Sequence, residues 1–458
     1  MTKTCRNLLI RNASEVMTGL SGPDARAGAV DIRVGGGRIV EMGPALQALA
    51  DEPVLDVNGC VIYPGWVNTH HHLFQTLLKG VPAGLDQSLS GWLAGVPYPR
   101  LGRYDPETVR AAARVGLTQL LLSGATTCAD HHYSYHADAS TETADVIFEV
   151  AEELGVRLVL CRGGALQTSS QPGFGANVLV PESLDAMVAD IERLKSRYHD
   201  PAPDAMTRVV LAPTTPTFSV LPWQLRELAR AARAMGLRLH THLSETGDYV
   251  TYCRERHGLL PVQFMAEHEW LGPDIWFAHL VHMTPEEIDL VAGSGAGLAH
   301  CPSSNCRLGS GIAPVPEMAE AGIPVSLGVD GPASNESGGM LAELRMAWLL
   351  HRATHGATAT TVEQVIGWAS VGGARVLDLP AVGTLQLGMA ADLVAYDLGQ
   401  LRNMGFHDPA LAPVIGGEPV RVRYSVVQGR VVVDNGVVPG LDEGALREDV
   451  HRAMSRLG

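Results

Sequence analysis

Short apolar runs recur between residues 61 and 330, and amphipathic stretches separate them. The runs lack the alternation of a half-exposed strand, so they are typical of parallel strands buried on both faces. Several stretches between them open with Pro, Ser or Thr followed by acids and close on Gly, which are helix start and stop signals. We therefore expect strands at 61–69, 126–131, 157–162, 208–213, 237–242, 275–279, 296–300 and 324–329.

Eight strands that alternate with helices are typical of one α/β fold, the (β/α)8 TIM barrel. We expect this barrel over residues 63–379. In that fold the active site forms at the C-terminal ends of the strands. A doubly wound open sheet is the alternative. It concentrates its site at one switch point and gives no reason for polar residues on many separate strands.

The two ends of the chain differ from the middle, because both contain short β-type runs split by Gly and Asn. GGRIVEMG near the start and QGRVVVDNG near the end look alike, and each predicts a hairpin around a Gly-Arg turn. We expect residues 1–62 and 380–440 to pair into a small β-sandwich beside the barrel, and residues 441–458 to form a C-terminal helix.

Six of the apolar runs end in residues that can bind a metal or transfer a proton. His70 and His72 are two residues apart in an extended segment, so both side chains point to one side and His71 points away. Three histidine nitrogens and one carboxylate make a typical site for a first-row metal. The pattern therefore predicts a metalloenzyme. The strand-end residues are His70, His71, His72, Asp130, His131, His132, His242, Glu245, His279, His300, Asn305 and Asp330.

Composition excludes several classes of protein. The formal net charge of −15 comes with no basic stripe, so we expect no nucleic-acid partner. The chain has no apolar run of membrane length, and polar residues interrupt its first segment where a signal peptide needs an apolar core. Seven scattered cysteines, an odd number, are typical of reduced thiols in a cytoplasmic protein. We expect a cytoplasmic enzyme that binds no membrane.

Five segments resemble motifs of the amidohydrolase superfamily, in particular its branch of aminohydrolases acting on aromatic N-heterocycles, alongside the triazine hydrolases. The resemblance covers essentially the whole chain, and AADLVAYDL near the end belongs to it. It implies that His70, His72, His242 and Asp330 are metal ligands. It also implies that Glu245, His279 and Asp330 are the catalytic residues that handle protons. The five segments are PGWVNTHHH, HTHLSET, AHLVHM, HCPSSN and LGVDGPASN.

The same resemblance implies one divalent metal per chain, with Zn2+ as the expected ion and Fe2+ as the alternative. Binuclear members of the superfamily bridge two metals with a carboxylated lysine at a mid-barrel strand end. The lysines of this chain are Lys3, Lys79 and Lys195, and none is expected at such a place. We therefore expect a mononuclear centre. The resemblance also implies a homo-oligomer, either a homodimer or a larger assembly.

The activity that the resemblance implies is hydrolytic deamination, in which water attacks the carbon that bears the amino group. Asp330 and His279 would accept or orient the proton of that water, and Glu245 would protonate a ring nitrogen before ammonia leaves. The small-molecule substrate would be a 2-amino-4-oxo bicyclic heterocycle, narrowly a pterin (isoxanthopterin to 7-oxylumazine) over 8-oxoguanine. Further alternatives are s-triazine dechlorination and a non-catalytic assembly protein on the same scaffold.

Gln75 and Arg162 match positions that face the substrate in oxopurine and pterin deaminases. An arginine can donate two N–H groups to a ring carbonyl and its neighbouring nitrogen, and a glutamine offers both donor and acceptor. A structural salt bridge or loop hydrogen bond is the alternative role for each. We expect residues 81–100 and 162–174 to distinguish ring sizes. The substrate-binding candidates are Gln75, Trp92, His131, His132, Arg162 and Asn305, with Tyr133, Gln167 and Ser334 beside them.

Overall fold

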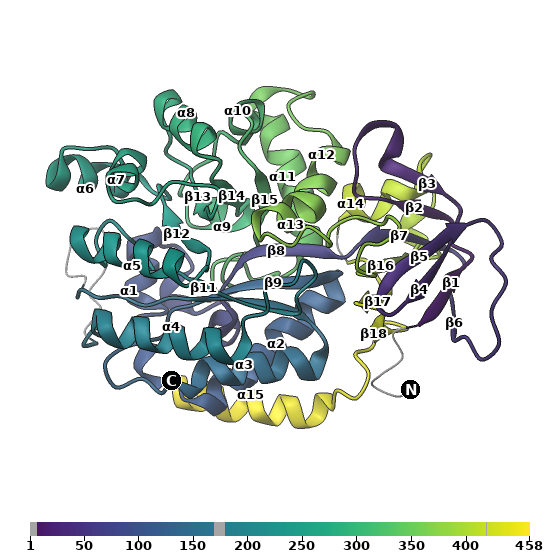
Figure 1. Ribbon diagram of the computed structural model, residues 1–458, viewed down its shortest axis with the longest axis horizontal. Coiled ribbons are helices and arrows are strands. Elements are labelled where there is room, and N and C mark those ends of the chain that lie inside the picture. Colours follow the sequence, from purple (N-terminus) through teal and green to yellow (C-terminus); the bar gives the residue numbers. More distant parts are fainter. Residues whose placement is uncertain (1–6, 169–178, 418) are drawn as a thin grey trace.

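The computed structural model describes residues 7–168, 179–417 and 419–458, and its centre is a barrel of parallel strands (Figure 1). The strands pair in chain order from β8 to β15. The barrel closes where the backbone N–H of Asp330, just after β15, donates to the carbonyl of His70 on β8 at 2.9 Å. The predicted (β/α)8 barrel is confirmed. Its strands are β8 Trp66–His71, β9 Ala125–His132, β10 Arg157–Arg162, β11 Thr207–Leu211, β12 Leu239–Leu243, β13 Ile275–His279, β14 Gly297–His300 and β15 Val325–Leu327.

Helices follow the strands and begin and end at the signals that the sequence carries. The helix α2, Pro106–Ser123, begins after Asp105, whose side chain accepts the Thr108 N–H, and ends at Gly124 with φ of 95°. The other α-helices up to residue 376 are α1 Leu89–Gly95, α3 Glu142–Leu154, α4 Leu184–Tyr198, α5 Pro222–Ala234, α6 Gly247–His257, α7 Pro261–Glu267, α8 Pro285–Ser294, α9 Pro302–Arg307, α10 Val315–Glu320, α11 Met340–His355, α12 Val362–Gly367 and α13 Gly373–Val376.

The first predicted strand, 61–69, is in fact two strands that belong to different sheets. β7, Cys60–Pro64, lies in a terminal sheet, and β8 opens the barrel. Gly65 joins them at a point where a Cβ atom would lie 2.2 Å from the Thr126 side chain. Only glycine allows this approach. An unbroken apolar run carries no sign of the change of sheet, so the sequence suggested one strand.

Two sheets lie beside the barrel, on the right in Figure 1: a four-stranded sheet of N-terminal strands in the order β5-β4-β1-β6, and a six-stranded sheet from both ends of the chain in the order β18-β17-β16-β7-β2-β3. β7 pairs with β16 across more than 300 residues of sequence, with Leu393 opposite Pro64. The two predicted hairpins form, β4–β5 and β17–β18. The strands are β1 Leu8–Arg11, β2 Glu15–Met17, β3 Arg26–Gly28, β4 Asp31–Gly35, β5 Arg38–Gly43, β6 Val54–Asp56, β16 Leu393–Asp397, β17 Val422–Val427 and β18 Arg430–Asp434. The helix α14, Ala412–Gly416, precedes β17.

The helix α15, Glu443–Leu457, packs along α2 beneath the barrel (Figure 1). Its Arg456 donates to the Asp105 carboxylate at 2.8 Å. This helix was expected at 441–458. The division of the whole chain into domains stays a prediction.

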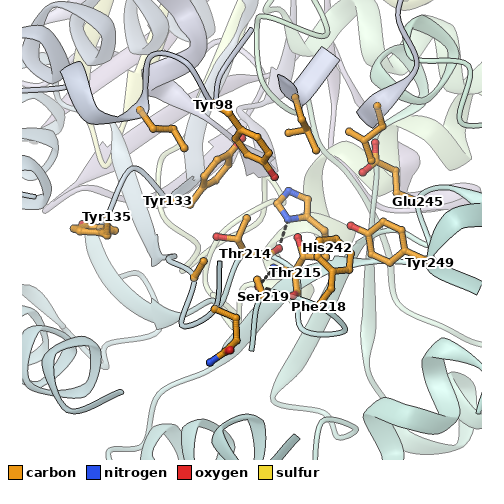
Figure 2. A pocket seen from close by; sticks show the side chains of 15 residues that line it. Tyr98, Tyr133, Tyr135, Thr214, Thr215, Phe218, Ser219, His242, Glu245 and Tyr249 are labelled. Carbon is orange, nitrogen blue, oxygen red and sulfur yellow. Dashed lines mark hydrogen bonds between the residues drawn. The ribbon is translucent and has the colours of Figure 1, made fainter. Parts of the chain in front are cut away.

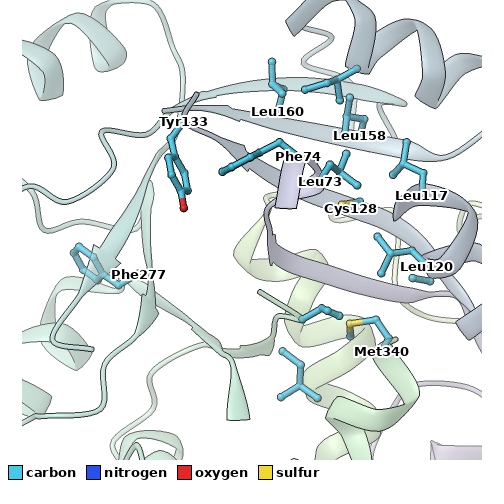
Figure 3. Packing of buried hydrophobic residues seen from close by; sticks show 14 of the residues in the cluster. Leu73, Phe74, Leu117, Leu120, Cys128, Tyr133, Leu158, Leu160, Phe277 and Met340 are labelled. Atoms are coloured by element: carbon cyan, nitrogen blue, oxygen red, sulfur yellow. The ribbon is translucent and has the colours of Figure 1, made fainter. Parts of the chain in front are cut away.

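The largest core cluster of the described residues extends around the barrel between the strands and the helices, and part of it lies between α2 and the strands (Figure 3). Leu117 and Leu120 of α2 belong to it together with Leu158 of β10, and all three are buried. Trp66 links this core to the terminal sheets, because its indole N–H donates to the Tyr396 hydroxyl at 2.7 Å. Close packing of these side chains holds the strand ends in place, and therefore also the side chains that follow them.

The length of the helices and the state of the cysteines can also be compared with the sequence. None of the helices in the described ranges is both long and apolar enough to cross a membrane. All six cysteines that the structure describes are free thiols, and Cys5 lies outside the described residues.

Candidate metal centre

His70, His72, His242 and Asp330 come together at the C-terminal end of the barrel. The Nε2 atom of His72 lies 3.2 Å from Nε2 of His242 and 3.1 Å from an Asp330 carboxylate oxygen. His70 Nε2 lies 3.3 Å from the same oxygen. Four residues from three strand ends thus direct one atom each to a common point, as the alternation along β8 predicts for His70 and His72.

The hydrogen bonds behind the three histidines decide which ring nitrogen faces that point. His72 Nδ1–H donates to the His131 carbonyl at 2.7 Å, and His242 Nδ1–H donates to the Thr214 carbonyl at 2.6 Å. A carbonyl can only accept, so in each neutral ring Nε2 carries a lone pair.

The orientation of His70 depends on His240, which the sequence analysis missed. His240 Nδ1–H donates to the Trp276 carbonyl at 2.9 Å, so its Nε2 accepts a hydrogen bond from His70 Nδ1–H at 2.8 Å. The Nε2 lone pair of His70 then points to the common point and has no hydrogen-bond partner. The sequence signal was present, since His240 and His242 are two apart in the strand HTHL.

Three converging lone pairs and one carboxylate oxygen, all buried, fit a divalent cation and repel one another without one. Burial lowers the pKa values of His70 and His242 well below the usual value, so these rings stay neutral and able to ligate. Burial alone would raise the pKa of Asp330, but the neighbouring His70 and His72 side chains lower it well below the ordinary range. The centre is suited to a first-row metal.

Glu245 and His279 lie next to this cluster. His279 Nε2 is 3.7 Å from a Glu245 carboxylate oxygen, and His279 Nδ1–H donates to Asn305 Oδ1 at 2.9 Å. Burial raises the pKa of Glu245, partly opposed by His279, so the carboxyl retains its proton at a higher pH than an exposed one. His279 and Asp330 have φ angles of 79° and 62°, which non-glycine residues rarely adopt and which are concentrated at functional sites.

A pocket of about 70 Å3 opens onto this cluster (Figure 2). Tyr98 and Tyr133 lie on one side of His242, and Glu245 and Tyr249 lie on another. Sequence analysis missed Tyr98, Phe218 and Tyr249; only the expectation for residues 81–100 pointed toward Tyr98. The lining residues are Leu89, Leu93, Tyr98, Leu101, Tyr133, Tyr135, Ala165, Gln167, Thr214, Thr215, Phe218, Ser219, His242, Glu245 and Tyr249.

Several predicted substrate contacts lie behind the pocket rather than on its wall. Gln75 donates to the Tyr133 hydroxyl at 2.8 Å and lies against Gly331, where a Cβ atom would be 1.7 Å from Gln75 Oε1. Trp92 donates to the Ala333 carbonyl at 3.1 Å. His132 pairs with the Ser134 hydroxyl. Their roles toward a substrate stay predictions, and Gln167 is the predicted neighbour that does line the pocket.

Three other histidines that were predicted at strand ends lie in different surroundings. His131 lies against the ligand cluster, because its ring stacks on His242 at 4.7 Å between centroids and its Nε2–H donates to the Ala212 carbonyl. His71 points away, toward Gly116 of α2. His300 pairs with His351 at 3.2 Å between Nε2 atoms.

Arg162 is buried in an ionic network instead of facing the pocket. Its guanidinium donates two bonds to Glu182 and one, at 3.0 Å, to Asp190, and it stacks over Tyr135 at 3.7 Å. Burial alone would lower the pKa of Arg162, but the Glu182 carboxylate raises it above the ordinary value. The structural salt bridge left open by the sequence is therefore present. Part of the predicted segment 162–174, residues 169–174, lies outside the described residues.

Comparison with known proteins agrees with this geometry. The model of the amidohydrolase family matches residues 61–432. The chain is 48% identical to isoxanthopterin deaminase from an unknown prokaryotic organism, with 98% of this chain and 97% of that protein covered. It is 42% identical to 8-oxoguanine deaminase from Pseudomonas aeruginosa, with 98% of each covered.

A solved structure shares the whole architecture as well. Atrazine chlorohydrolase TrzN from Arthrobacter aurescens TC1, complexed with zinc, superposes with a TM-score of 0.91 at 30% identity, with 98% of this chain and 100% of that chain covered. The barrel, the histidine and aspartate side chains that converge at its strand ends and the family match over most of the length lead to one conclusion: this chain belongs to the amidohydrolase family.

Proposed function

We propose that this protein is a metal-dependent hydrolytic deaminase that removes the exocyclic amino group of a 2-amino-4-oxo bicyclic heterocycle. We propose isoxanthopterin as the substrate and 7-oxylumazine as the product. The observation that carries the proposal is 48% identity over 98% of the chain with a protein named isoxanthopterin deaminase. The acid Glu245 beside a buried ligand cluster and a pocket supports the same chemistry.

His70, His72, His242 and Asp330 would hold one divalent metal, with zinc proposed because the similar chlorohydrolase was solved with zinc. A divalent metal in such a site lowers the pKa of water and supplies a nucleophile at neutral pH. A mononuclear centre is supported by the lysines: Lys79 donates to Gln119 at 2.7 Å and Lys195 is in α4, so neither described lysine is at a barrel strand end.

The protein's own side chains supply the proton transfers. Asp330 and His279 accept or orient the proton of the attacking water, and Asn305 holds the His279 ring with Nε2 toward Glu245. Glu245, whose pKa burial raises, delivers a proton to a ring nitrogen so that the amino-bearing carbon becomes electrophilic. The proton taken from water then passes to the amino group, which leaves as ammonia, and the hydroxyl proton of the adduct returns to Glu245 as the new carbonyl forms, so the starting protonation states are restored.

The aromatic walls of the pocket suit a flat heterocycle. Tyr98, Tyr133, Phe218 and Tyr249 surround the space next to His242 (Figure 2). The four rings offer stacking surfaces, and the hydroxyl groups of the three tyrosines offer hydrogen bonds to ring carbonyls and nitrogens. Such a pocket favours an aromatic substrate over an aliphatic amide.

8-Oxoguanine is the second candidate substrate, because the chain is 42% identical to 8-oxoguanine deaminase over nearly its full length. Both substrates carry the same 2-amino-4-oxo pyrimidine ring, so the residues around that ring cannot separate them. The 36% identity to a hydroxydechloroatrazine ethylaminohydrolase from a Pseudomonas species extends the comparison to triazines, at lower similarity.

The deciding experiment compares ammonia release from isoxanthopterin, 8-oxoguanine and guanine under identical conditions, with metal content measured on the same preparation. We expect about one divalent metal per chain and the highest kcat/KM for isoxanthopterin. Metal-loaded protein that releases no ammonia from any of these substrates would refute the deaminase proposal, and a higher kcat/KM for 8-oxoguanine would replace the pterin.

Replacing Glu245 by Gln tests the proton shuttle. Gln keeps the shape of the side chain but carries no transferable acid proton, so we expect unchanged metal content and a loss of kcat of about 100-fold or more. Glu227→Gln, on the exposed side of α5, is the matched control and should leave kcat unchanged. Near-normal turnover of the Glu245→Gln variant would remove Glu245 from the mechanism.

We also propose that the protein works in the cytoplasm as a homo-oligomer. The six free thiols among the described cysteines support a reducing compartment. Light scattering on the purified protein measures the oligomeric state, and a monomer would contradict this part of the proposal.

A further inference from the structure

Asp330 adopts a backbone conformation that needs outside support. Its φ of 62° lies in the left-handed region, which a non-glycine residue occupies only when surrounding contacts impose it. In this conformation its carboxylate reaches His70 and His72. Whatever holds the backbone on either side of Asp330 therefore decides where this carboxylate points.

Hydrogen bonds hold the carbonyl groups on both sides of Asp330. The Val329 carbonyl accepts from the Asn335 side-chain amide at 2.8 Å. The Gly331 carbonyl accepts from the Ser334 backbone N–H at 2.9 Å and from the Ser334 hydroxyl at 3.1 Å. The Asn335 amide thus holds the peptide plane between Val329 and Asp330, which sets the φ of Asp330, and Ser334 holds the peptide plane that follows Gly331.

Glu343 on α11 fixes the amide of Asn335 in turn. One Glu343 carboxylate oxygen accepts the second Asn335 amide N–H at 2.6 Å, and the other accepts the Ser303 backbone N–H at 3.2 Å. Asn335 and Glu343 are buried, and neither is among the described residues that line the pocket. A buried carboxylate that serves two N–H donors on different segments is a connection that a neutral amide cannot reproduce.

The segment on the other side of Glu343 leads to His279. Ser303 lies in α9, which also carries Asn305, and Asn305 Oδ1 accepts the His279 Nδ1–H. A second bond joins the same segments, because the Ser304 hydroxyl donates to the Ser334 hydroxyl at 2.9 Å. One network of buried hydrogen bonds therefore connects the supports of Asp330 and of His279.

We infer that Asn335 and Glu343 are positioning residues for this centre: Glu343 orients the Asn335 amide, and that amide holds the Val329 carbonyl so that Asp330 keeps its left-handed conformation. The inference rests on the proposed role of Asp330. It assigns a function to two residues that contact neither the ligand cluster nor the pocket. It also explains a buried carboxylate, Glu343, that the chemistry itself does not use.

A double variant distinguishes a positioning role of these residues from a purely structural one. In the double variant Asn335→Asp, Glu343→Gln, the new amide at 343 can donate to the carboxylate at 335 and its oxygen can still accept from Ser303. The connection between α11, α9 and the loop is kept, but the Val329 carbonyl loses its N–H donor. We therefore expect a melting temperature close to that of the wild type together with a defect at the centre.

The measurements are zinc affinity by chelator competition, and kcat and KM for isoxanthopterin. Loss of a residue that orients a ligand typically reduces metal affinity or activity by about 10–100-fold. We expect such a loss in zinc affinity or in kcat, with KM changed less than about twofold. Wild-type zinc affinity and kcat in the folded double variant would overturn the inference.

The single variant Glu343→Gln decides the question if the double variant does not fold. Its amide must face either Asn335 or Ser303 with an N–H group, so the Asn335 amide or α9 shifts, and we expect a loss in the same two measurements. Unchanged zinc affinity and kcat would overturn the inference here as well. Zinc affinity needs no substrate, so a wild type that binds zinc but deaminates nothing would refute the proposed function and leave the positioning test intact.

Discussion

Replacing Arg162 by Met removes the positive charge that pairs with both buried carboxylates, Glu182 and Asp190. Glu182 loses both of its bonds to the guanidinium, whereas Asp190 keeps a bond from Arg193 at 2.9 Å. All three side chains of the Arg162–Glu182–Asp190 group are nearly inaccessible, at 2%, 6% and 4% exposure. Methionine fills similar space but leaves the Glu182 charge without an ion-pair partner among the described residues.

The expected loss of stability follows from these contacts. Breaking a buried ion pair by removing one partner costs about 3–5 kcal/mol, because the remaining charge stays desolvated. Loss of the stacking of the guanidinium on Tyr135, at 3.7 Å, adds roughly 1 kcal/mol. We therefore expect the free energy of unfolding to fall by about 4 kcal/mol or more, while the metal content of the folded fraction stays the same.

The assay is chemical denaturation followed by fluorescence, with KM measured in parallel. Arg110→Met is the matched control, since it breaks an exposed pair with Glu149 that is worth less than about 1 kcal/mol. Adding Glu182→Gln to Arg162→Met should restore part of the stability, because the unpaired charge is then gone. If Arg162→Met were as stable as the control but raised KM tenfold, Arg162 would face the substrate and this reasoning would be wrong.

Two further predictions concern the centre and its surroundings. Burial raises the pKa of Asp130 to about 7, from 3.8. The folded state therefore binds the proton more tightly, so Asp130 destabilises the protein as pH rises from about 4 to 7; Asp130→Asn should gain up to roughly 4 kcal/mol relative to the wild type over that range and no more above it. Parallel denaturant titrations at several pH values check this, and a pH-independent difference would contradict it. His240→Phe removes the acceptor for His70 Nδ1–H and should weaken zinc binding about 10–100-fold in chelator competition, whereas unchanged affinity would show that His240 does not orient His70.

Prediction from the sequence worked where a local pattern has one physical meaning. Apolar runs without alternation must be buried on both faces, and the strands at 157–162 and 275–279 have the predicted bounds. The same holds for His70 and His72, whose common direction follows from the period of a strand. Prediction from the sequence failed at Gly65, because an apolar run does not reveal a change from one sheet to another.

For the substrate side, residue type and position were insufficient. Arg162 ends a barrel strand, where the sequence suggested a substrate contact, but its partners Glu182 and Asp190 are 20 and 28 residues away along the chain. Asn305 was expected at the substrate, and its Oδ1 accepts a hydrogen bond from His279 Nδ1–H, a contact that the sequence did not indicate; its role toward a substrate stays a prediction. Charge and hydrogen-bond pairing depend on which segments fold against one another, and this information is not local.

By itself the sequence determined the barrel, the paired chain ends and the residues able to bind a metal, because these follow from the periodicity of burial and from the donor atoms of side chains. Only the tertiary structure decided which nitrogen of each histidine faces the centre, through carbonyl groups of Thr214, Trp276 and His131 contributed by other strands and loops. The tertiary structure also brought Asn335 and Glu343 together with the Val329 carbonyl next to Asp330. Hydrogen bonds are short and directional, so partners distant in sequence are assigned only when the chain brings them within about 3 Å of one another.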